Sequence, residues 1–114
     1  MEKYIKNIAH ETPLSLLDEV SYQSGQIVSK TLAQNQYNSV TLFAFDKGEE
    51  ISTHASDGDA IVICLDGQGE ITIDGKKYEL NAGETIVMPA KKPHAVFAKE
   101  KFKMLLVVIF PLNR

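Results

Sequence analysis

The chain has 114 residues, of which 12 are Lys or Arg and 15 are Asp or Glu. This length suits one domain with a single hydrophobic core and is too short for two such cores. No basic run is longer than a pair such as Lys91-Lys92. The chain therefore lacks the clustered positive charge that nucleic-acid binding requires, and no nucleic-acid partner is expected.

The composition predicts a cytoplasmic protein without a membrane partner. Cys64 is the only cysteine, and one thiol cannot form an internal disulfide. Residues 1–20 mix charges of both signs with short apolar pieces, and they lack the apolar core and cleavage site of a signal peptide. The longest apolar run, 104–112, contains Pro111 and is about half as long as a membrane helix. We therefore expect this run to be a buried strand.

The N-terminal third, residues 1–38, is expected to hold a short helix and the first strand. The helix is predicted over 14–20, where Pro13 suits the first turn and Thr12 is a suitable cap. The first strand is expected within 22–34. This segment precedes a barrel over 39–114, within one domain overall, and it is the predicted contact in a dimer.

Turn signals recur at nearly even intervals after residue 45 and predict an all-β fold. Gly and Asx pairs, such as the Asp74-Gly75 hairpin turn, alternate with short runs of β-branched and aromatic residues. The strands expected from these runs are 40–45, 60–65, 70–73, 77–80, 85–88, 95–98 and 102–110.

Two of these strands are apolar on both faces, namely 60–65 and, within 102–110, the run 104–110. A sheet with one wet face would alternate apolar with polar residues. One face is expected to line the barrel interior. The other needs cover from a second sheet, from the N-terminal segment or from a partner subunit, so the pattern favours a homodimer.

Two of the β-rich segments carry one histidine each and resemble the two signature motifs of the cupin family. The first motif reads Gly, five residues, His, one residue, His, three or four residues, Glu, six residues, Gly. Gly48, His54 and Gly67 match it, whereas Ser56 replaces the second histidine and Ala60 the glutamate.

The second motif reads Gly, five residues, Pro, one residue, Gly, two residues, His, three residues, Asn. Gly83, Pro89 and His94 match it, whereas Lys91 replaces the glycine and Ala98 the asparagine. The resemblance spans residues 40–110. It implies a cupin barrel, which is a jelly roll or double-stranded β-helix, and a homodimer of the kind that small cupins commonly form by exchanging N-terminal strands.

Cupins that bind metal hold iron, manganese, nickel, copper or zinc with three histidines and the glutamate. Only His54 and His94 occupy such positions here, which is one ligand short of the usual three. The hydroxyl of Ser56 is a weak ligand for these ions. Strand alternation turns Asp57 and Asp59 away from the ligand positions, unless the Asp57-Gly58 turn breaks it. We expect at most a reduced metal site.

The barrel is expected to enclose a cavity that binds a small organic molecule, such as a sugar-like or aromatic compound. The residues predicted to line it are His54, Ser56, Val62, Cys64, Met88, His94 and Val96. Met88 is expected to pack as core, and Cys64 is expected to be an inert, buried thiol. Asp59 either closes a tight turn or supplies a carboxylate that is hydrogen-bonded to a histidine as an acid/base pair.

Three functions follow from this site. The first is a ligand-binding barrel with little or no metal. The second is a metal-dependent cupin enzyme, an oxygenase, isomerase or lyase acting on a small substrate. The third is metal-free acid/base catalysis, as in the sugar epimerase branch of the cupins. The fold does not choose among them, and the sequence assigns no catalytic residue.

Overall fold

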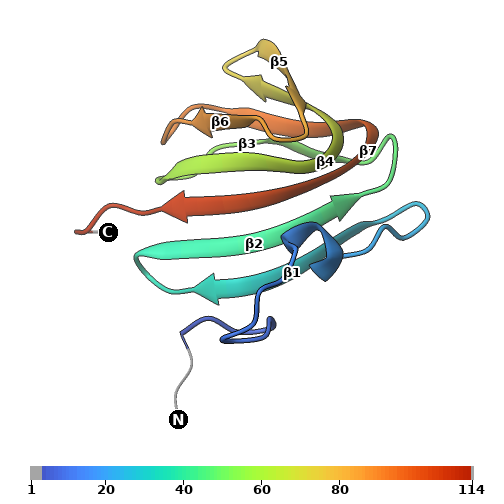
Figure 1. Ribbon diagram of the computed structural model, residues 1–114. Coiled ribbons are helices and arrows are strands. Elements are labelled where there is room, and N and C mark those ends of the chain that lie inside the picture. Colours follow the sequence, from blue (N-terminus) through green and yellow to red (C-terminus); the bar gives the residue numbers. More distant parts are fainter. Residues whose placement is uncertain (1–3, 114) are drawn as a thin grey trace.

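Two long strands, β4 (Asp59–Ile73) and β7 (His94–Ile109), form the spine of the molecule (Figure 1). The structure is a computed structural model that describes residues 4–113. The other described elements are the 3-10 helix η1 (Leu16–Glu19) and the strands β1 (Ile27–Gln34), β2 (Asn38–Phe45), β3 (Glu50–His54), β5 (Lys76–Asn81) and β6 (Thr85–Met88).

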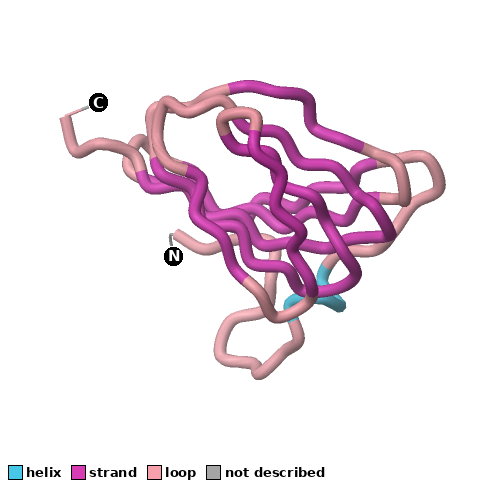
Figure 2. Tube along the Cα trace, turned by 90° about the horizontal axis from the view of Figure 1, so that it is seen from above, coloured by secondary structure: helices cyan, strands magenta, loops and turns pink. Residues whose placement is uncertain are grey.

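β4 and β7 pair in antiparallel fashion along their whole length, from Asp59 opposite Ile109 to Ile73 opposite His94. The first half of β4 also pairs with β6, and its second half pairs with β5. The later part of β7 pairs with β2, which in turn pairs with β1, and the beginning of β7 pairs with β3. The two long strands thus run through both sides of the fold, and the strands curve around a common interior (Figure 2).

Two glycines mark the bend of β4. The register of the β4–β7 pair shifts between Cys64 and Asp66 and again between Gly67 and Gly69. Gly67 has a φ of 76°, which an L side chain rarely adopts. A Cβ atom on Gly69 would meet the ring of Phe102 at 2.7 Å. The bend therefore requires the glycine that closes the first motif.

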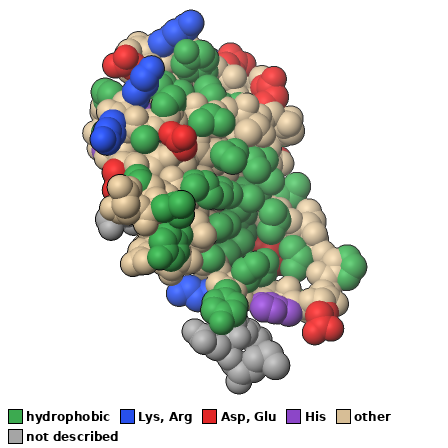
Figure 3. Space-filling model, turned by 90° about the vertical axis from the view of Figure 1, so that its left-hand side faces the viewer, with side chains coloured by type: hydrophobic (Ala, Val, Ile, Leu, Met, Phe, Trp, Pro, Cys, Tyr) green, Lys and Arg blue, Asp and Glu red, His purple; other side chains and the backbone are tan. Residues whose placement is uncertain are grey.

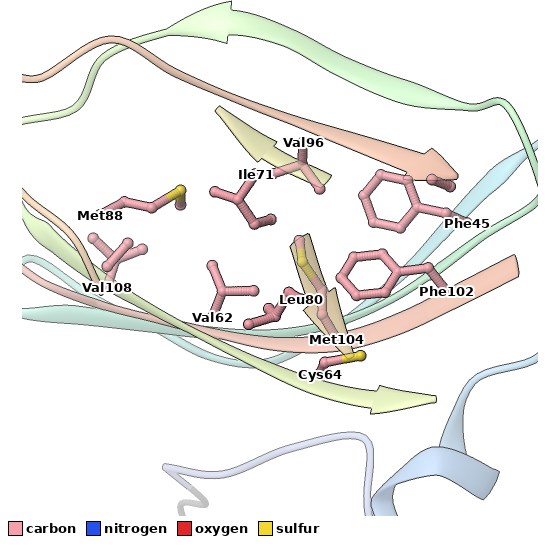
Figure 4. Close-up of a cluster of buried hydrophobic side chains, with 12 residues drawn as sticks. Phe45, Val62, Cys64, Ile71, Leu80, Met88, Val96, Phe102, Met104 and Val108 are labelled. Atoms are coloured by element: carbon pink, nitrogen blue, oxygen red, sulfur yellow. The ribbon is translucent and has the colours of Figure 1, made fainter. Parts of the chain in front are cut away.

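A cluster of inward-facing side chains fills much of the barrel (Figure 4). Met88 and Val108 lie at one end of it, and Phe45 and Phe102 lie at the other. The two phenylalanine rings have centroids 5.5 Å apart and both side chains are fully buried. The aromatic pair thus closes one end of the interior with close-packed side chains.

The N-terminal segment covers part of the outer face of the sheet. Val20 and Leu32 are buried there against Leu42 and Ala44 of β2. The buried Lys103 holds the segment, since its Nζ donates to the carbonyl oxygen of Leu17 at 2.6 Å.

Tyr22 adds a second tie between this segment and the barrel. Its hydroxyl donates to Oδ2 of Asp66 at 2.6 Å. Nζ of Lys103 lies 4.9 Å from the centre of the Tyr22 ring, within the range of a cation–π contact. The segment is therefore bound by directed polar contacts as well as by apolar packing.

The structure confirms the all-β jelly-roll fold and corrects several details. Strands 60–65 and 70–73 are one strand, β4, and 95–98 and 102–110 are one strand, β7, because bulges rather than breaks accommodate the bends. The strand β3 was not predicted, since its sequence, EISTH, carries only one apolar residue.

The helix predicted over 14–20 is a single 3-10 turn, Leu16–Glu19. Thr12 does not cap it, because its hydroxyl donates to the carbonyl oxygen of His10 instead. Ser15 stands at the N-cap without a side-chain hydrogen bond. Without a cap, this short run does not nucleate an α-helix. Within residues 4–113, no helix has the length and apolar character needed to cross a membrane.

Candidate functional site

A cavity of about 180 Å³ lies inside the barrel. It is bounded by eleven side chains, of which three are polar: His54, Ser56 and His94. The eight hydrophobic ones are Phe43, Ile51, Ala60, Met88, Val96, Met104, Leu106 and Val108. The cavity is smaller than the sites of drug-sized ligands, which measure about 300–1,000 Å³, so it suits a small molecule.

The two motif histidines meet at this cavity. β3 and β7 pair so that His54 lies directly opposite His94. The centres of the two imidazole rings are 4.4 Å apart, and the ring planes are inclined at 67°. His54 is exposed to solvent, whereas only 5% of His94 is exposed. His54 therefore lies at the surface end of the pair, and His94 lies in the buried part of the cavity wall.

Each histidine is oriented by a backbone carbonyl two residues before it. Nδ1 of His54 lies 2.9 Å from the carbonyl oxygen of Ser52, and Nδ1 of His94 lies 3.0 Å from that of Lys92. A carbonyl oxygen only accepts hydrogen bonds, so Nδ1 carries the hydrogen in both rings. In the neutral imidazole, Nε2 is then left with its lone pair.

The pKa of His94 is lower than its ordinary value. Burial is the main cause, because it penalises the charged imidazolium, and the nearby His54 adds repulsion. The hydrogen bond to the carbonyl of Lys92 acts in the opposite direction and is outweighed. His94 is therefore neutral at pH 7 and offers an acceptor at Nε2.

Ser56 lines the cavity, but its hydroxyl is used within its own turn. Oγ donates to the carbonyl oxygen of Gly58 at 3.1 Å and accepts from the amide of Gly58 at 3.4 Å. This local hydrogen bonding is typical of serine in a tight turn. Ser56 is thus a weak candidate for a metal or ligand contact.

Asp59 acts as a clamp between two loops and does not pair with a histidine. Its Oδ1 accepts from the amide of Ala90 at 2.7 Å, and Asp59 lies outside the cavity lining. The amide of Lys91 donates to the carbonyl oxygen of Ser56 at 2.7 Å, which ties the same two loops. Of the two interpretations of Asp59, the structural one agrees with these contacts.

Val62 and Cys64 lie in the core cluster and not on the cavity wall. Both face inward from β4, but they are fully buried among other side chains (Figure 4). The thiol of Cys64 donates to the carbonyl oxygens of Asp66 and Gly67. Burial raises the pKa of Cys64 to about 11, so the thiol stays protonated at neutral pH and is a poor nucleophile.

The donor set does not fit the metal site that the cupin motifs imply. Ser56 and Ala60 line the cavity at the positions of the missing histidine and glutamate, and neither supplies a strong ligand. Between residues 4 and 113 no group of three or more His, Cys, Asp or Glu side chains is arranged to hold a metal ion. Two imidazoles alone fall short of a three-ligand centre.

Most of the wall was not anticipated from the sequence. His54, Ser56, Met88, His94 and Val96 line the cavity, as their motif positions indicate. The residues that were missed are Phe43, Ile51, Ala60, Met104, Leu106 and Val108. Strand alternation carries the signal for the last three, which share one face of β7, whereas Ile51 lies on the strand β3 that was not predicted.

Comparisons with known proteins agree with this architecture. The chain superposes on the crystal structure of a conserved protein of unknown function from Streptococcus pyogenes with a TM-score of 0.95, at 50% identity, covering 96% of each chain. It is also similar to a cupin superfamily protein from Desulfitobacterium hafniense, with a TM-score of 0.90, at 34% identity, covering 94% of this chain and 98% of that one.

A shorter match links the chain to an uncharacterized protein from Methanocaldococcus jannaschii, with 42% identity over 36 residues. This match covers 32% of the chain and 29% of that curated relative. The family model described as Cupin domain matches residues 41–110, which include both motif histidines and the whole cavity wall. The chain therefore belongs to the cupin family.

Proposed function

We propose that the protein binds one small, largely apolar organic molecule in the barrel cavity. The observation that carries this proposal is the cavity wall, on which eight of the eleven side chains are hydrophobic and the polar ones include the histidine pair. Ligand sites typically combine such an apolar wall with a few polar groups that fix orientation. Burial of the ligand's apolar surface would supply most of the binding free energy.

The same wall favours an aromatic or alicyclic ring over a sugar. Each hydroxyl of a sugar needs a hydrogen-bond partner when it leaves water, and an unpaired one costs about 1–3 kcal/mol. Met88, Met104 and Leu106 provide no such partners. Only the side with His54 and His94 can satisfy a polar group, so the ligand has few of them.

The contacts favour neither competing enzymatic function. A metal-dependent reaction would need ligands beyond His54 and His94, and the wall supplies none of ordinary strength. Acid/base catalysis would need a carboxylate paired with a histidine, whereas Asp59 is bound to the amide of Ala90. Ligand binding, by contrast, requires only the apolar wall and the histidine pair that line the cavity.

The test is a titration with toluene and phenol, followed through the methyl signals of Met88 and Met104 by NMR. Both methionines line the cavity, so saturable shifts of their methyl signals are expected with at least one probe. Leu106→Trp, which fills the cavity, should abolish the shifts. Val107→Trp places the same ring on the opposite face of β7 and should leave them unchanged. Shifts that persist in Leu106→Trp would refute binding in the cavity.

We also propose that the protein is a homodimer. Val87 of β6, Ile61 of β4 and Val107 of β7 are neighbours across the sheet on the face that points away from the core cluster. Val87 is 51% exposed, and Ile109, on the same face of β7, is 53% exposed. Hydrophobic side chains gather on the surface shown in Figure 3. We call Ile61, Val87, Val107 and Ile109 the exposed row, and we propose that a second copy of the chain covers it.

A further inference from the structure

We infer that the cavity selects a neutral ring compound that donates a hydrogen bond, such as a phenol or another hydroxylated ring. This inference rests on the proposed function and narrows its ligand class. The feature that carries it is the polarity of the few polar side chains on the wall. In their neutral form His54 and His94 keep acceptors at Nε2, and among the described residues no other lining side chain has a free donor.

The first step is the orientation of the two rings. The carbonyls of Ser52 and Lys92 hold Nδ1 of His54 and His94, at 2.9 Å and 3.0 Å. In its neutral form each ring therefore keeps its hydrogen at Nδ1 and its lone pair at Nε2. Backbone carbonyls set this choice, so it does not depend on the ligand.

The second step is the placement of the acceptors. The ring centres are 4.4 Å apart and both rings line the cavity. One hydroxyl can donate to either Nε2, and a ring with two adjacent hydroxyls can donate to both. An aromatic or alicyclic body then packs against Met88, Val96 and Leu106.

The third step is the lack of a complementary group for other ligands. Ser56 uses its hydroxyl for Gly58, and among residues 4–113 no Asp, Glu, Lys or Arg side chain lines the cavity. A carboxylate would face two lone pairs and an apolar wall, and the desolvation of its charge would not be repaid. The oxygen of an ether or a ketone only accepts hydrogen bonds, so it would face the lone pair of Nε2 with no hydrogen between them. Binding therefore discriminates by donor and by charge.

The experiment compares four probes of similar size at pH 8: phenol, anisole, toluene and benzoate. Anisole keeps the oxygen of phenol and lacks its donor, which makes it the matched control. Phenol should bind about tenfold more tightly than anisole or toluene, the value of one hydrogen bond, and benzoate more weakly than all three. The double variant His54→Phe and His94→Phe, which removes both acceptors, should bind phenol no more tightly than toluene, whereas His10→Phe, outside the cavity, should retain the preference.

The outcomes separate this inference from the proposed function. Equal affinities for phenol, anisole and toluene in the wild type would overturn the donor preference and leave the ligand-binding barrel intact. Saturable binding of none of the probes would overturn both. Tightest binding of benzoate would overturn the inference alone.

A second readout uses the unliganded wild-type protein and does not depend on a variant that folds. Long-range ¹H–¹⁵N correlation spectra distinguish a protonated from an unprotonated ring nitrogen. At pH 8, both His54 and His94 should show a protonated Nδ1 and an unprotonated Nε2. A protonated Nε2 in either ring would overturn the inference, because that ring would present a donor to the cavity.

Discussion

The carbonyl oxygen of Lys101 occupies the space that a Cβ atom on Gly67 would need. Gly67 also has a positive φ, so an alanine at this position meets both a backbone obstruction and an unfavourable conformation. The first cupin motif ends at this glycine because β4 bends there and β7 passes close to it.

Gly67→Ala should destabilise the fold more than Gly48→Ala. Gly48 also has a positive φ, but nothing lies within 4 Å of its Cβ position. Gly48→Ala should therefore lower the free energy of unfolding by about 1 kcal/mol, the cost of the conformation alone. Gly67→Ala should cost about 3 kcal/mol or more, because the backbone must move. Urea denaturation measures both, and equal losses would contradict the argument.

The sequence was sufficient for the fold because turns and motif glycines are local signals. Residues such as Asp74-Gly75 and Gly67 predict bends regardless of what packs around them. β3 was not predicted, because its strand structure depends on tertiary pairing and not on a local signal. Glu50–His54 is polar and short, and it becomes a strand only by pairing with β7. Tertiary pairing of this kind overrides local propensity.

The site was harder to predict than the fold. The motif spacing identified His54 and His94, and alternation placed Val62 and Cys64 on the inner face, where they lie. Alternation cannot say how deep along the barrel the cavity reaches. Phe45 and Phe102 fill one end of the interior, and Val62 and Cys64 belong to the packed core and not to the cavity wall. The engagement of Asp59 with Ala90 likewise depends on loop geometry that no spacing reveals.

Tyr22→Phe should loosen the N-terminal segment. The variant keeps the ring that lies near Lys103 and removes the hydroxyl that donates to Asp66. Hydrogen bonds to charged groups contribute about 1.5–3 kcal/mol, and partial exposure reduces this, so we expect a loss of about 1–2 kcal/mol. Tyr37→Phe, at an exposed tyrosine, should change the free energy of unfolding by less than about 0.5 kcal/mol. Equal stability of Tyr22→Phe and wild type would contradict this role.

Acid should destabilise the protein partly through His94. The folded pKa of His94 lies below its ordinary value, mainly because of burial, so the unfolded chain binds a proton more readily than the folded chain. Stability is then fully present above the ordinary histidine pKa, near 6.5, and falls as the pH drops through the lower folded pKa. Urea midpoints should therefore stay constant between pH 7.5 and about 6.5, the ordinary histidine pKa, and decrease below it.

His94→Phe isolates this contribution from that of the acidic residues. The difference in unfolding free energy between wild type and variant should shrink or reverse as the pH falls, because the variant has no imidazole to protonate there. His10→Asn changes an exposed histidine and should follow the wild type. A constant difference between wild type and His94→Phe across this range would show that His94 does not contribute.

The proposed dimer should dissociate when charge is placed in the exposed row. Light scattering after size-exclusion chromatography is expected to give about twice the mass of one chain for the wild type. The double variant Val87→Lys and Ile109→Lys puts two cations on positions that are 51% and 53% exposed, so the fold itself should tolerate it. It should elute as a monomer. A monomeric wild type, or a variant that remains dimeric, would rule out this interface.

Metal binding should be weak in the wild type and gained by restoring the motif. Elemental analysis after dialysis should find well under one metal ion per chain, and the same in His54→Ala and His94→Ala, because two imidazoles form an incomplete ligand set. Ser56 and Ala60 line the same cavity as the histidines. The double variant Ser56→His and Ala60→Glu therefore adds an imidazole and a carboxylate beside the existing pair.

This variant should bind cobalt(II) or nickel(II) stoichiometrically, which visible absorption of the cobalt form and elemental analysis would both report. Loss of binding on a further His94→Ala change would locate the ion at the restored site. Val87→His combined with Thr85→Glu, on exposed positions of β6 outside the cavity, provides a control with the same added side chains. A folded Ser56→His and Ala60→Glu protein that binds no metal would mean that positions 54, 56, 60 and 94 do not converge. Stoichiometric metal in the wild type, lost in both alanine variants, would instead establish a two-histidine centre and favour the metal-dependent enzyme over the ligand-binding barrel.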